Sequence, residues 1–202
     1  MEAAERAACA ASGAVHTIGH TTRAIEAFLA LLAEHAIECV VDVRRWPASR
    51  RHPHFAREAL AGSLAAAGID YVWRGDLGGY RTPARESPNT GWRVGAFRAY
   101  ADFMLTVEFE EALAPVERLA ARRRIALMCA EAVPWRCHRQ LVADALTVRG
   151  WDVRHIADHG CAPHRLTAFA RPEGHRILYP AESLWDPAVP EPGPRRGGGA
   201  PC

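Results

Sequence analysis

Lysine is absent from this 202-residue chain, so all 25 basic residues are arginine. They are nearly balanced by 23 acidic residues, and a net charge of +2 does not by itself demand a nucleic-acid partner. No apolar run approaches the roughly 18 residues that a membrane-spanning helix needs. The first residues carry glutamates and lack a basic segment followed by a long apolar stretch, so we expect no signal peptide and a cytoplasmic location.

The length of the chain favours one domain, and an apolar fraction of 49% is ample for one core. We expect a flexible leader at residues 1–13, an α/β domain at 14–180 and a disordered tail rich in Pro, Gly and Arg at 187–202. The six cysteines are expected to be reduced rather than paired, because no secretory signal accompanies them.

Apolar runs and helical stripes alternate along the chain. Strands are expected at residues 14–18, 37–43, 71–73, 125–129 and 151–156, and helices at 56–67, 95–104, 107–122 and 138–149. One more helix follows the stripe from Ile25 to Leu32, with Thr21 or Thr22 as its cap. This alternation predicts a single α/β domain with a mainly parallel sheet of about five strands and helices on both faces. His164–Leu166 and Ile177–Tyr179 are expected to add a small hairpin or edge element.

The segment from Cys129 to Arg139 concentrates reactive side chains between a buried strand and a helix start. Cys137 lies beside His138 and between two arginines, which favours a thiolate, and Cys129 is a candidate partner thiol. The functional interpretation is a nucleophile or a redox pair, with His138 as proton carrier. The alternative is two buried cysteines that act as small hydrophobes.

Zinc is the less favoured interpretation of Cys129, Cys137 and His138. The gap between the cysteines matches no common zinc spacing, so we expect no metal and no other cofactor.

Asp42 and Glu131 are the candidate general acid or base groups, because both follow predicted strands. The alternative for each carboxylate is an ion pair with a neighbouring arginine: Arg44, Arg136 or Arg139.

A basic loop after the second strand suggests an anionic ligand, because arginine binds phosphate in a bidentate way and tryptophan can stack on a base. The turn after the first strand adds backbone donors at a helix start. The alternative is a solvated loop. The candidate anion-binding residues are Gly19, His20, Thr21, Arg44, Trp46, Arg50, Arg51 and Arg139.

The chain resembles the bacterial family catalogued as domain of unknown function 488. The resemblance covers roughly residues 15 to 180 and rests on TIGHTTR (17–23), VDVRRWPASRR (41–51), the Leu77-Gly78-Gly79 turn, FRAYADFM (97–104), MCAEAVPWRCHR (128–139) and HRLTAFAR (164–171). It implies that the following residues occupy the motif positions of the family: Gly19, His20, Asp42, Arg44, Cys129, Glu131, Cys137, His138 and Arg139.

A weaker likeness is to rhodanese-type domains, which share the Val-Asp-Val-Arg strand end and a later strand, cysteine loop and helix. The loop after Cys129 departs from that pattern, because it is longer, contains Glu131 and Cys137, and lacks the glycine-rich cradle.

Our leading hypothesis is a small cytoplasmic enzyme, a thiol-dependent transferase or hydrolase, with a cysteine-centred, arginine-rich site for an anionic, phosphate-bearing substrate. The first alternative is a module that binds nucleic acid or processes a base at its glycosidic bond through Asp42 or Glu131. The second alternative is a non-catalytic ligand-binding domain. The expected partners are an anionic small molecule or a nucleic acid, and no membrane.

Overall fold

The computed structural model describes residues 13–49 and 51–181. The expected tail, the expected leader except Gly13, and the candidate Arg50 lie outside these residues. The strands are β1 (Ala14–Gly19), β2 (Cys39–Asp42), β3 (Asp70–Trp73), β4 (Ile125–Cys129), β5 (Asp152–Ala157), β6 (Gly160–Pro163), β7 (Arg171–Glu173) and β8 (Arg176–Leu178). The α-helices are α2 (Ile25–Glu34), α3 (Arg57–Ala66), α4 (Gly95–Phe103), α5 (Val107–Ala120) and α6 (Arg139–Val148). Short 3₁₀ turns lie at Pro53–Phe55, Gly75–Leu77 and Pro134–Arg136.

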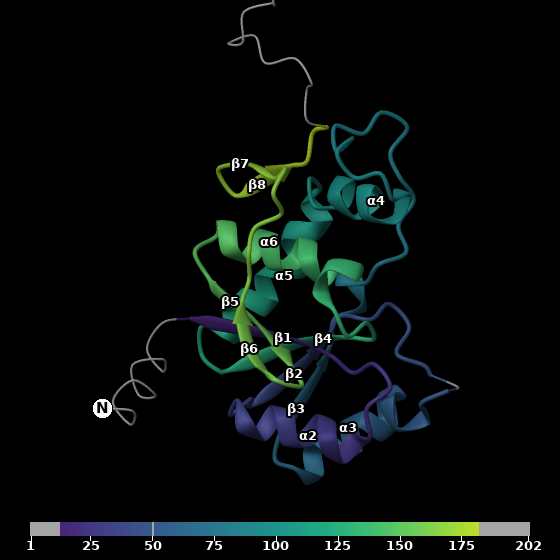
Figure 1. Cartoon of the computed structure of the whole chain (residues 1–202), viewed down its shortest axis with the longest axis vertical. Coiled ribbons are helices and arrows are strands. Elements are labelled where there is room, and N and C mark those ends of the chain that lie inside the picture. Colours follow the sequence, from purple (N-terminus) through teal and green to yellow (C-terminus); the bar gives the residue numbers. More distant parts are fainter. Residues whose placement is uncertain (1–12, 50, 182–202) are drawn as a thin grey trace, which may run out of the picture.

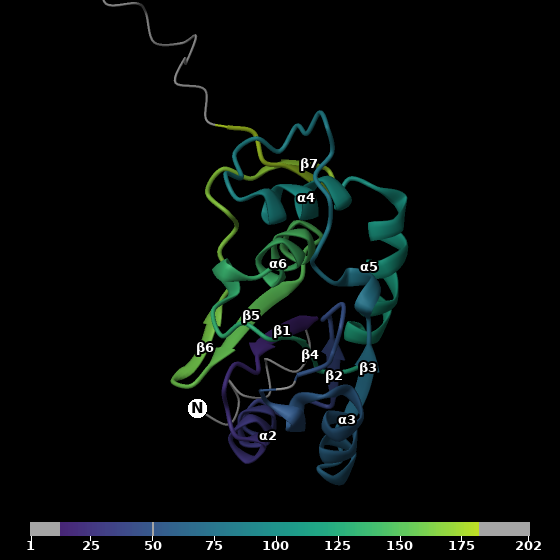
Figure 2. The same cartoon turned by 90° about the vertical axis from the view of Figure 1, so that its right-hand side faces the viewer.

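The main sheet has six strands in the order β3-β2-β4-β1-β5-β6. All neighbouring pairs are parallel except β5 and β6, which are antiparallel. The helices α2 and α3 cover one face, and α4, α5 and α6 lie on the other side (Figures 1 and 2). The expected single α/β domain with helices on both faces is therefore confirmed. The sixth strand, β6, was not expected.

Strand β4 shows why the core has two halves. All five of its residues are buried. Ile125, Leu127 and Cys129 pack in the core half that includes α5 and α6, whereas Ala126 and Met128 pack in the half that includes α2 and α3. A strand covered on both faces has no polar side, which explains its uninterrupted apolar sequence.

Strands β1 and β4 are neighbours at the centre of the sheet, and the chain leaves them in opposite directions. From β1 it passes through α2 to β2, and from β4 it passes through α6 to β5, on the other face. This is a topological switch point, where open α/β sheets form a crevice at the carboxyl ends of the strands. The segment from Cys129 to His138, called the cysteine loop below, lies at that edge between β4 and α6.

The first turn after β1 is tied to the loop after β4. The amide of His20 donates to the carbonyl oxygen of Cys129 at 2.9 Å, and the amide of Thr21 donates to that of Ala130 at 2.8 Å. Gly19 has no room for a side chain, because a Cβ there would lie 1.8 Å from the carbonyl oxygen of Glu131. The glycine therefore permits the close approach of the two loops.

Two details differ from the expectations. Helix α2 begins after Ala24, which provides no side-chain cap, so the expected capping by Thr21 or Thr22 is wrong. The expected hairpin is formed by β7 and β8, and β8 includes Ile177 and Leu178 but not His164–Leu166. Among the described residues, no helix combines the length and the apolar character that crossing a bilayer requires.

Candidate functional site

A cleft of about 590 Å³ opens at the carboxyl ends of the central strands. Residues from the loops after β1, β2 and β4 line it, together with residues from α4 and from the loop that follows Leu77. The side chains that matter for chemistry are His20, Arg44, Arg45, Trp46, Ser49, Tyr80, Tyr100, Cys129, Glu131, Arg136, Cys137 and His138. The switch point therefore brings together candidates from three separate segments of the sequence.

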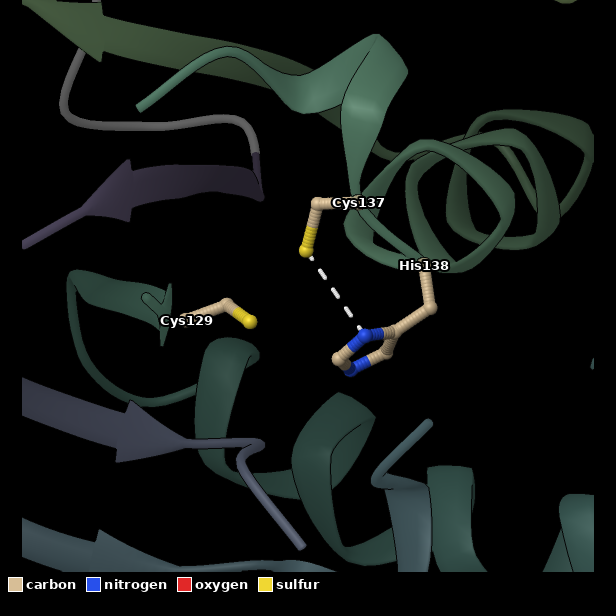
Figure 3. Close-up of side chains that lie close together, drawn as sticks. All are labelled: Cys129, Cys137 and His138. Atoms are coloured by element: carbon tan, nitrogen blue, oxygen red, sulfur yellow. Dashed lines mark hydrogen bonds between the residues drawn. The ribbon is translucent and has the colours of Figure 1, made fainter. Parts of the chain in front are cut away.

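Cys129, Cys137 and His138 all line this cleft, and their side chains converge (Figure 3). Their two sulfur atoms and a ring nitrogen all lie within 4.8 Å of one another. The Cys137 sulfur is 3.6 Å from Nδ1 of His138. Both cysteines are buried, at 7% and 4% exposure, but both line the cleft. This geometry is that of a thiol pair with an adjacent base, and the same three atoms could also hold a metal ion.

The two thiols have different acidities because they share one hydrogen bond. The hydrogen bond with Cys129 lowers the pKa of Cys137 to about 7, although burial acts in the opposite direction. The positive charge of Arg139 and its backbone N–H, which donates to the Cys137 sulfur at 3.5 Å, lower this pKa further. The same bond with Cys137 and burial raise the pKa of Cys129. Of the two thiols, Cys137 is therefore the one whose ionisation the surroundings favour.

His138 is held in one orientation by the end of β2. Its Nε2 lies 3.2 Å from the carbonyl oxygen of Val43, which can only accept a hydrogen bond. In the neutral ring the proton therefore resides on Nε2, and Nδ1 faces the Cys137 sulfur with a free lone pair. This tautomer can accept a proton from Cys137.

Arg139 is buried at 1% exposure and does not line the cleft. It donates to the carbonyl oxygens of Glu131 and Ala132 and to the Thr17 hydroxyl, so it braces the cysteine loop from behind. Among the described residues it forms no ion pair with a carboxylate. The structure thus places Arg139 behind the cysteine loop, and its side chain does not face the cleft as that of an anion-binding residue would. Ionisation of Cys137 would supply a negative charge that complements this buried guanidinium.

A buried hydrogen-bonded chain continues behind Arg139. The Thr17 hydroxyl lies 2.7 Å from Nδ1 of His155, whose Nε2 lies 2.9 Å from His164. The far nitrogen of His164 lies 2.8 Å from the buried carboxylate of Asp144. When both imidazoles are neutral, all of these hydrogen bonds can run in one direction. In each of them the group nearer Arg139 donates and the group nearer Asp144 accepts.

Reasoning from sequence found no functional pattern for His155 and His164, and a structural or solvated role was the default expectation for both. Thr17 and His155 are direct partners in the register of β1 with β5, and no local pattern carries that information.

Asp42 is fully buried and engaged on both oxygens. Its carboxylate accepts two hydrogen bonds from the Arg44 side chain, at 2.9 and 2.6 Å, and one from the Tyr71 hydroxyl at 2.7 Å. Arg44 also donates to Nε2 of His20 at 3.2 Å. Of the two interpretations of Asp42, the ion pair with Arg44 is the one that the geometry shows. The pair holds His20 and the guanidinium of Arg44 at the wall of the cleft.

The turn after β1 offers less to a ligand than its sequence suggests, because the amides of His20 and Thr21 are used by the loop after β4. Burial and the nearby Arg44 lower the pKa of His20 to about 4, so its ring is neutral near pH 7.

The arginines on the cleft overlap only in part with those expected, since Arg44 lines it as expected. Arg45 and Arg136 line it, and neither forms an ion pair among the described residues, whereas the exposed Arg51 lies outside its lining. Trp46 is 63% exposed, and its ring centroid lies 5.2 Å from that of Tyr80 and 5.6 Å from the guanidinium of Arg45. Arg45 belongs to the basic loop that the sequence had suggested for an anionic ligand, whereas Arg136, Ser49 and Tyr80 are cleft residues that the sequence did not single out as ligand-binding.

Glu131 is exposed at the same cleft. Within the described part of the chain its carboxylate forms no ion pair, so of the two candidate carboxylates it is the accessible one.

Comparison with known proteins supports the resemblance in sequence. Residues 24–146 match the family model described as "Domain of unknown function DUF488", and this span includes the whole cysteine loop. Neither the curated proteins nor the solved structures gave a match. Because the family model covers more than half of the chain and contains the thiol pair and His138, the chain belongs to the domain of unknown function DUF488 family.

Proposed function

We propose that this protein is a small enzyme that uses the Cys137 sulfur as a nucleophile toward an anionic substrate. One observation carries the proposal: Cys137 lies 3.6 Å from a correctly oriented His138 nitrogen in a cleft that also contains Arg45 and Arg136. Nucleophile, base and orienting group are the parts that covalent catalysis requires. Within the described residues, neither Cys129 nor Cys137 is part of a disulfide, so both sulfur atoms can exist as thiols.

The reaction class that fits these parts is a thiol-dependent transfer or hydrolysis. The Cys137 thiol gives its proton to Nδ1 of His138, and the sulfur forms a bond to the electrophilic atom of the substrate. The leaving group departs with its bonding electrons and takes the proton from His138. Water or an acceptor then displaces the sulfur, with the accessible Glu131 as the base that removes a proton from the incoming group.

The anionic part of the substrate is proposed to bind Arg45 and Arg136. Both guanidiniums line the cleft without carboxylate partners among the described residues, so their donors are available to a ligand. Arginine presents a planar fork of donors that matches a phosphate or carboxylate group.

Charge-selective alkylation tests this proposal without knowledge of the substrate. Iodoacetate and iodoacetamide attack thiols in the same way but differ in charge. We expect iodoacetate to modify Cys137 faster, relative to iodoacetamide, than it modifies Cys161, which lies outside the cleft lining. The variant Arg45→Gln with Arg136→Gln should remove this preference, and the control Arg51→Gln should keep it. Equal preferences at Cys137 and Cys161 in the unmodified protein would argue against an anion site at the thiol.

A second candidate function is favoured by the exposed aromatic side chains. Trp46 and Trp135 are 63% and 66% exposed, and Tyr80 is 80% exposed beside Trp46. Aromatic rings beside arginines can stack on the bases of a single strand. For base processing, Glu131 is the accessible carboxylate, since Asp42 is buried against Arg44.

Binding of a fluorescent single-stranded oligonucleotide at increasing salt concentrations tests this alternative. Phosphate contacts predict an affinity that falls steeply with salt. Loss of binding in Trp46→Ala would support base stacking, whereas no binding at low salt would remove the alternative.

A further inference from the structure

We propose that Cys129, Cys137 and His138 also form a three-ligand site for a thiophilic divalent cation, for which Zn²⁺ is the best fit. The inference goes beyond the proposed function. A sulfur atom that donates an electron pair to a metal ion is a weaker nucleophile, so the metal-bound protein would be a less reactive form.

The spacing of the three ligand atoms fits such an ion. In a tetrahedral zinc site, bonds of about 2.3 Å to sulfur and about 2.0–2.1 Å to nitrogen place the ligand atoms about 3.5–3.8 Å apart. The sulfur of Cys137 and Nδ1 of His138 are 3.6 Å apart, and all three atoms lie within 4.8 Å of one another. Small side-chain rotations would therefore bring all three within bonding distance of one ion.

The surroundings of the ligand atoms also fit. Metal-binding histidines usually donate their other ring N–H to a backbone carbonyl or a carboxylate, which fixes the ring. His138 does this through Nε2 and the carbonyl oxygen of Val43 at 3.2 Å, and leaves Nδ1 facing the sulfur atoms. The sulfur of Cys137 accepts the backbone N–H of Arg139, a hydrogen bond that stabilises a coordinated thiolate.

The fold brings the three ligands together, although their spacing in the sequence matches no common zinc motif. Cys129 ends β4, and Cys137 and His138 stand immediately before α6, so the intervening loop returns the chain to the same point. The expectation of no metal rested on the number of residues between the cysteines. That number does not show that the loop brings Cys137 back beside Cys129.

The cleft determines what the fourth coordination position would hold. All three ligands line the cleft, so the remaining position faces it rather than the core. Three protein ligands and one open position are typical of catalytic zinc sites. Two thiolates neutralise a divalent cation, and the buried positive charge of Arg139 then favours an anionic fourth ligand such as hydroxide or an anion from solution.

Cobalt substitution in the full-length protein provides the test. Metal-free protein, prepared with a chelator and a reductant, is titrated with Co²⁺ and then with Zn²⁺. We expect one equivalent of Co²⁺ to give near-ultraviolet bands of thiolate-to-metal charge transfer and visible bands of tetrahedral geometry, and Zn²⁺ to displace it. Cys129→Ser should weaken binding by at least about tenfold, and the matched control Cys161→Ser should bind as the unmodified protein does. An unmodified protein without charge-transfer bands, or bands unchanged in a folded Cys129→Ser variant, would overturn the inference.

A second measurement needs no variant. Zn²⁺ should protect Cys137 from alkylation and leave Cys161 reactive, and the chelator should restore the reaction. Protection of neither cysteine, or of both equally, would contradict binding at this site.

The inference and the proposed function can fail separately. A reactive Cys137 in protein that binds no metal would overturn the inference alone. Tight Co²⁺ binding with an unreactive Cys137 in the metal-free protein would overturn the proposed function alone.

Discussion

The carbonyl oxygen of Val43 accepts a hydrogen bond from Nε2 of His138, with the two atoms 3.2 Å apart. Val43 follows β2, and His138 stands before α6, so this bond joins two segments that are 95 residues apart in sequence. It fixes the tautomer of the imidazole, and the nitrogen that faces Cys137 is left to accept a proton or to bind a metal ion. Both proposals for this site depend on that orientation.

Replacing Cys129 with alanine is expected to make Cys137 a weaker acid. The hydrogen bond from Cys129 is the largest cause of the lowered pKa of Cys137, which is about 7. Without it the midpoint of alkylation against pH should move upward. A pKa higher by about one lowers the thiolate fraction about tenfold at pH values below the midpoint. Rates of Cys137 alkylation across pH in metal-free protein locate the midpoint, and Cys39→Ala is the control. An unchanged midpoint in Cys129→Ala would show that the thiol pair does not set the acidity.

Replacing Gly19 with alanine is expected to destabilise the fold by about 1–3 kcal/mol or more, because overpacking forces backbone to move. The added Cβ would lie 1.8 Å from the carbonyl oxygen of Glu131. Gly62 is the matched control, since it lies on α3 with no atom within 4 Å of an added Cβ. There alanine should stabilise by about 0.5–1 kcal/mol through its higher helix propensity. Urea unfolding of both variants checks the opposite signs, and a tolerated Gly19→Ala would contradict the close contact.

The buried pair of Asp42 and Arg44 is expected to be sensitive to loss of one partner. Asp42→Asn leaves a buried guanidinium without a counter-charge and should cost about 3–5 kcal/mol. Tyr71→Phe removes only one hydrogen bond to the same carboxylate and should cost about 1 kcal/mol. Asp76→Asn, in the more exposed pair with Arg74, serves as the control and should cost no more than about 1 kcal/mol. Equal costs for Asp42→Asn and Asp76→Asn in urea unfolding would refute the distinction.

His16 is expected to make stability depend on pH. Burial, followed by the positive charges of His35, Arg124 and Arg154, lowers its pKa from 6.5 to about 4. The unfolded chain therefore binds the proton more readily. The stability contributed by the neutral ring is fully present above pH 6.5 and is lost as pH falls through about 4, by no more than about 3 kcal/mol.

The variant His16→Leu should flatten this dependence between pH 6.5 and 4, because it removes the titrating group. The exposed His175 provides the control variant, His175→Gln, which should leave the slope as it is. Free energies of unfolding at several pH values measure the slope, and a slope unaffected by His16→Leu would show that other groups produce it.

The sequence predicted the strands of the core well because strands covered on both faces read as apolar runs, as Ile125 to Cys129 does. It also predicted that the candidate residues gather at one edge of the sheet, because the carboxyl ends of parallel strands coincide there. The prediction that Thr21 or Thr22 caps the helix was wrong. The backbone amides of that turn are hydrogen-bonded to the loop after β4, and α2 starts only after Ala24.

The sequence could not tell which arginines face the cleft. Arg44 and Arg45 are adjacent and both line the cleft, but the first pairs with the buried Asp42, and the second lies beside Trp46 without an ion pair among the described residues. The bracing of the cysteine loop by Arg139 depends on long-range contacts such as that with Thr17, which become visible only in three dimensions.

The proposed function requires Cys137 to be an activated thiol, and residue-resolved alkylation tests this requirement most directly. Metal-free protein at pH 7 is treated with less than one equivalent of iodoacetamide, and the modified cysteines are identified by mass spectrometry. We expect Cys137 to be modified before Cys161, although Cys137 is only 4% exposed and Cys161 is partly exposed. Modification of Cys161 first, with Cys137 left intact, would refute the proposed function.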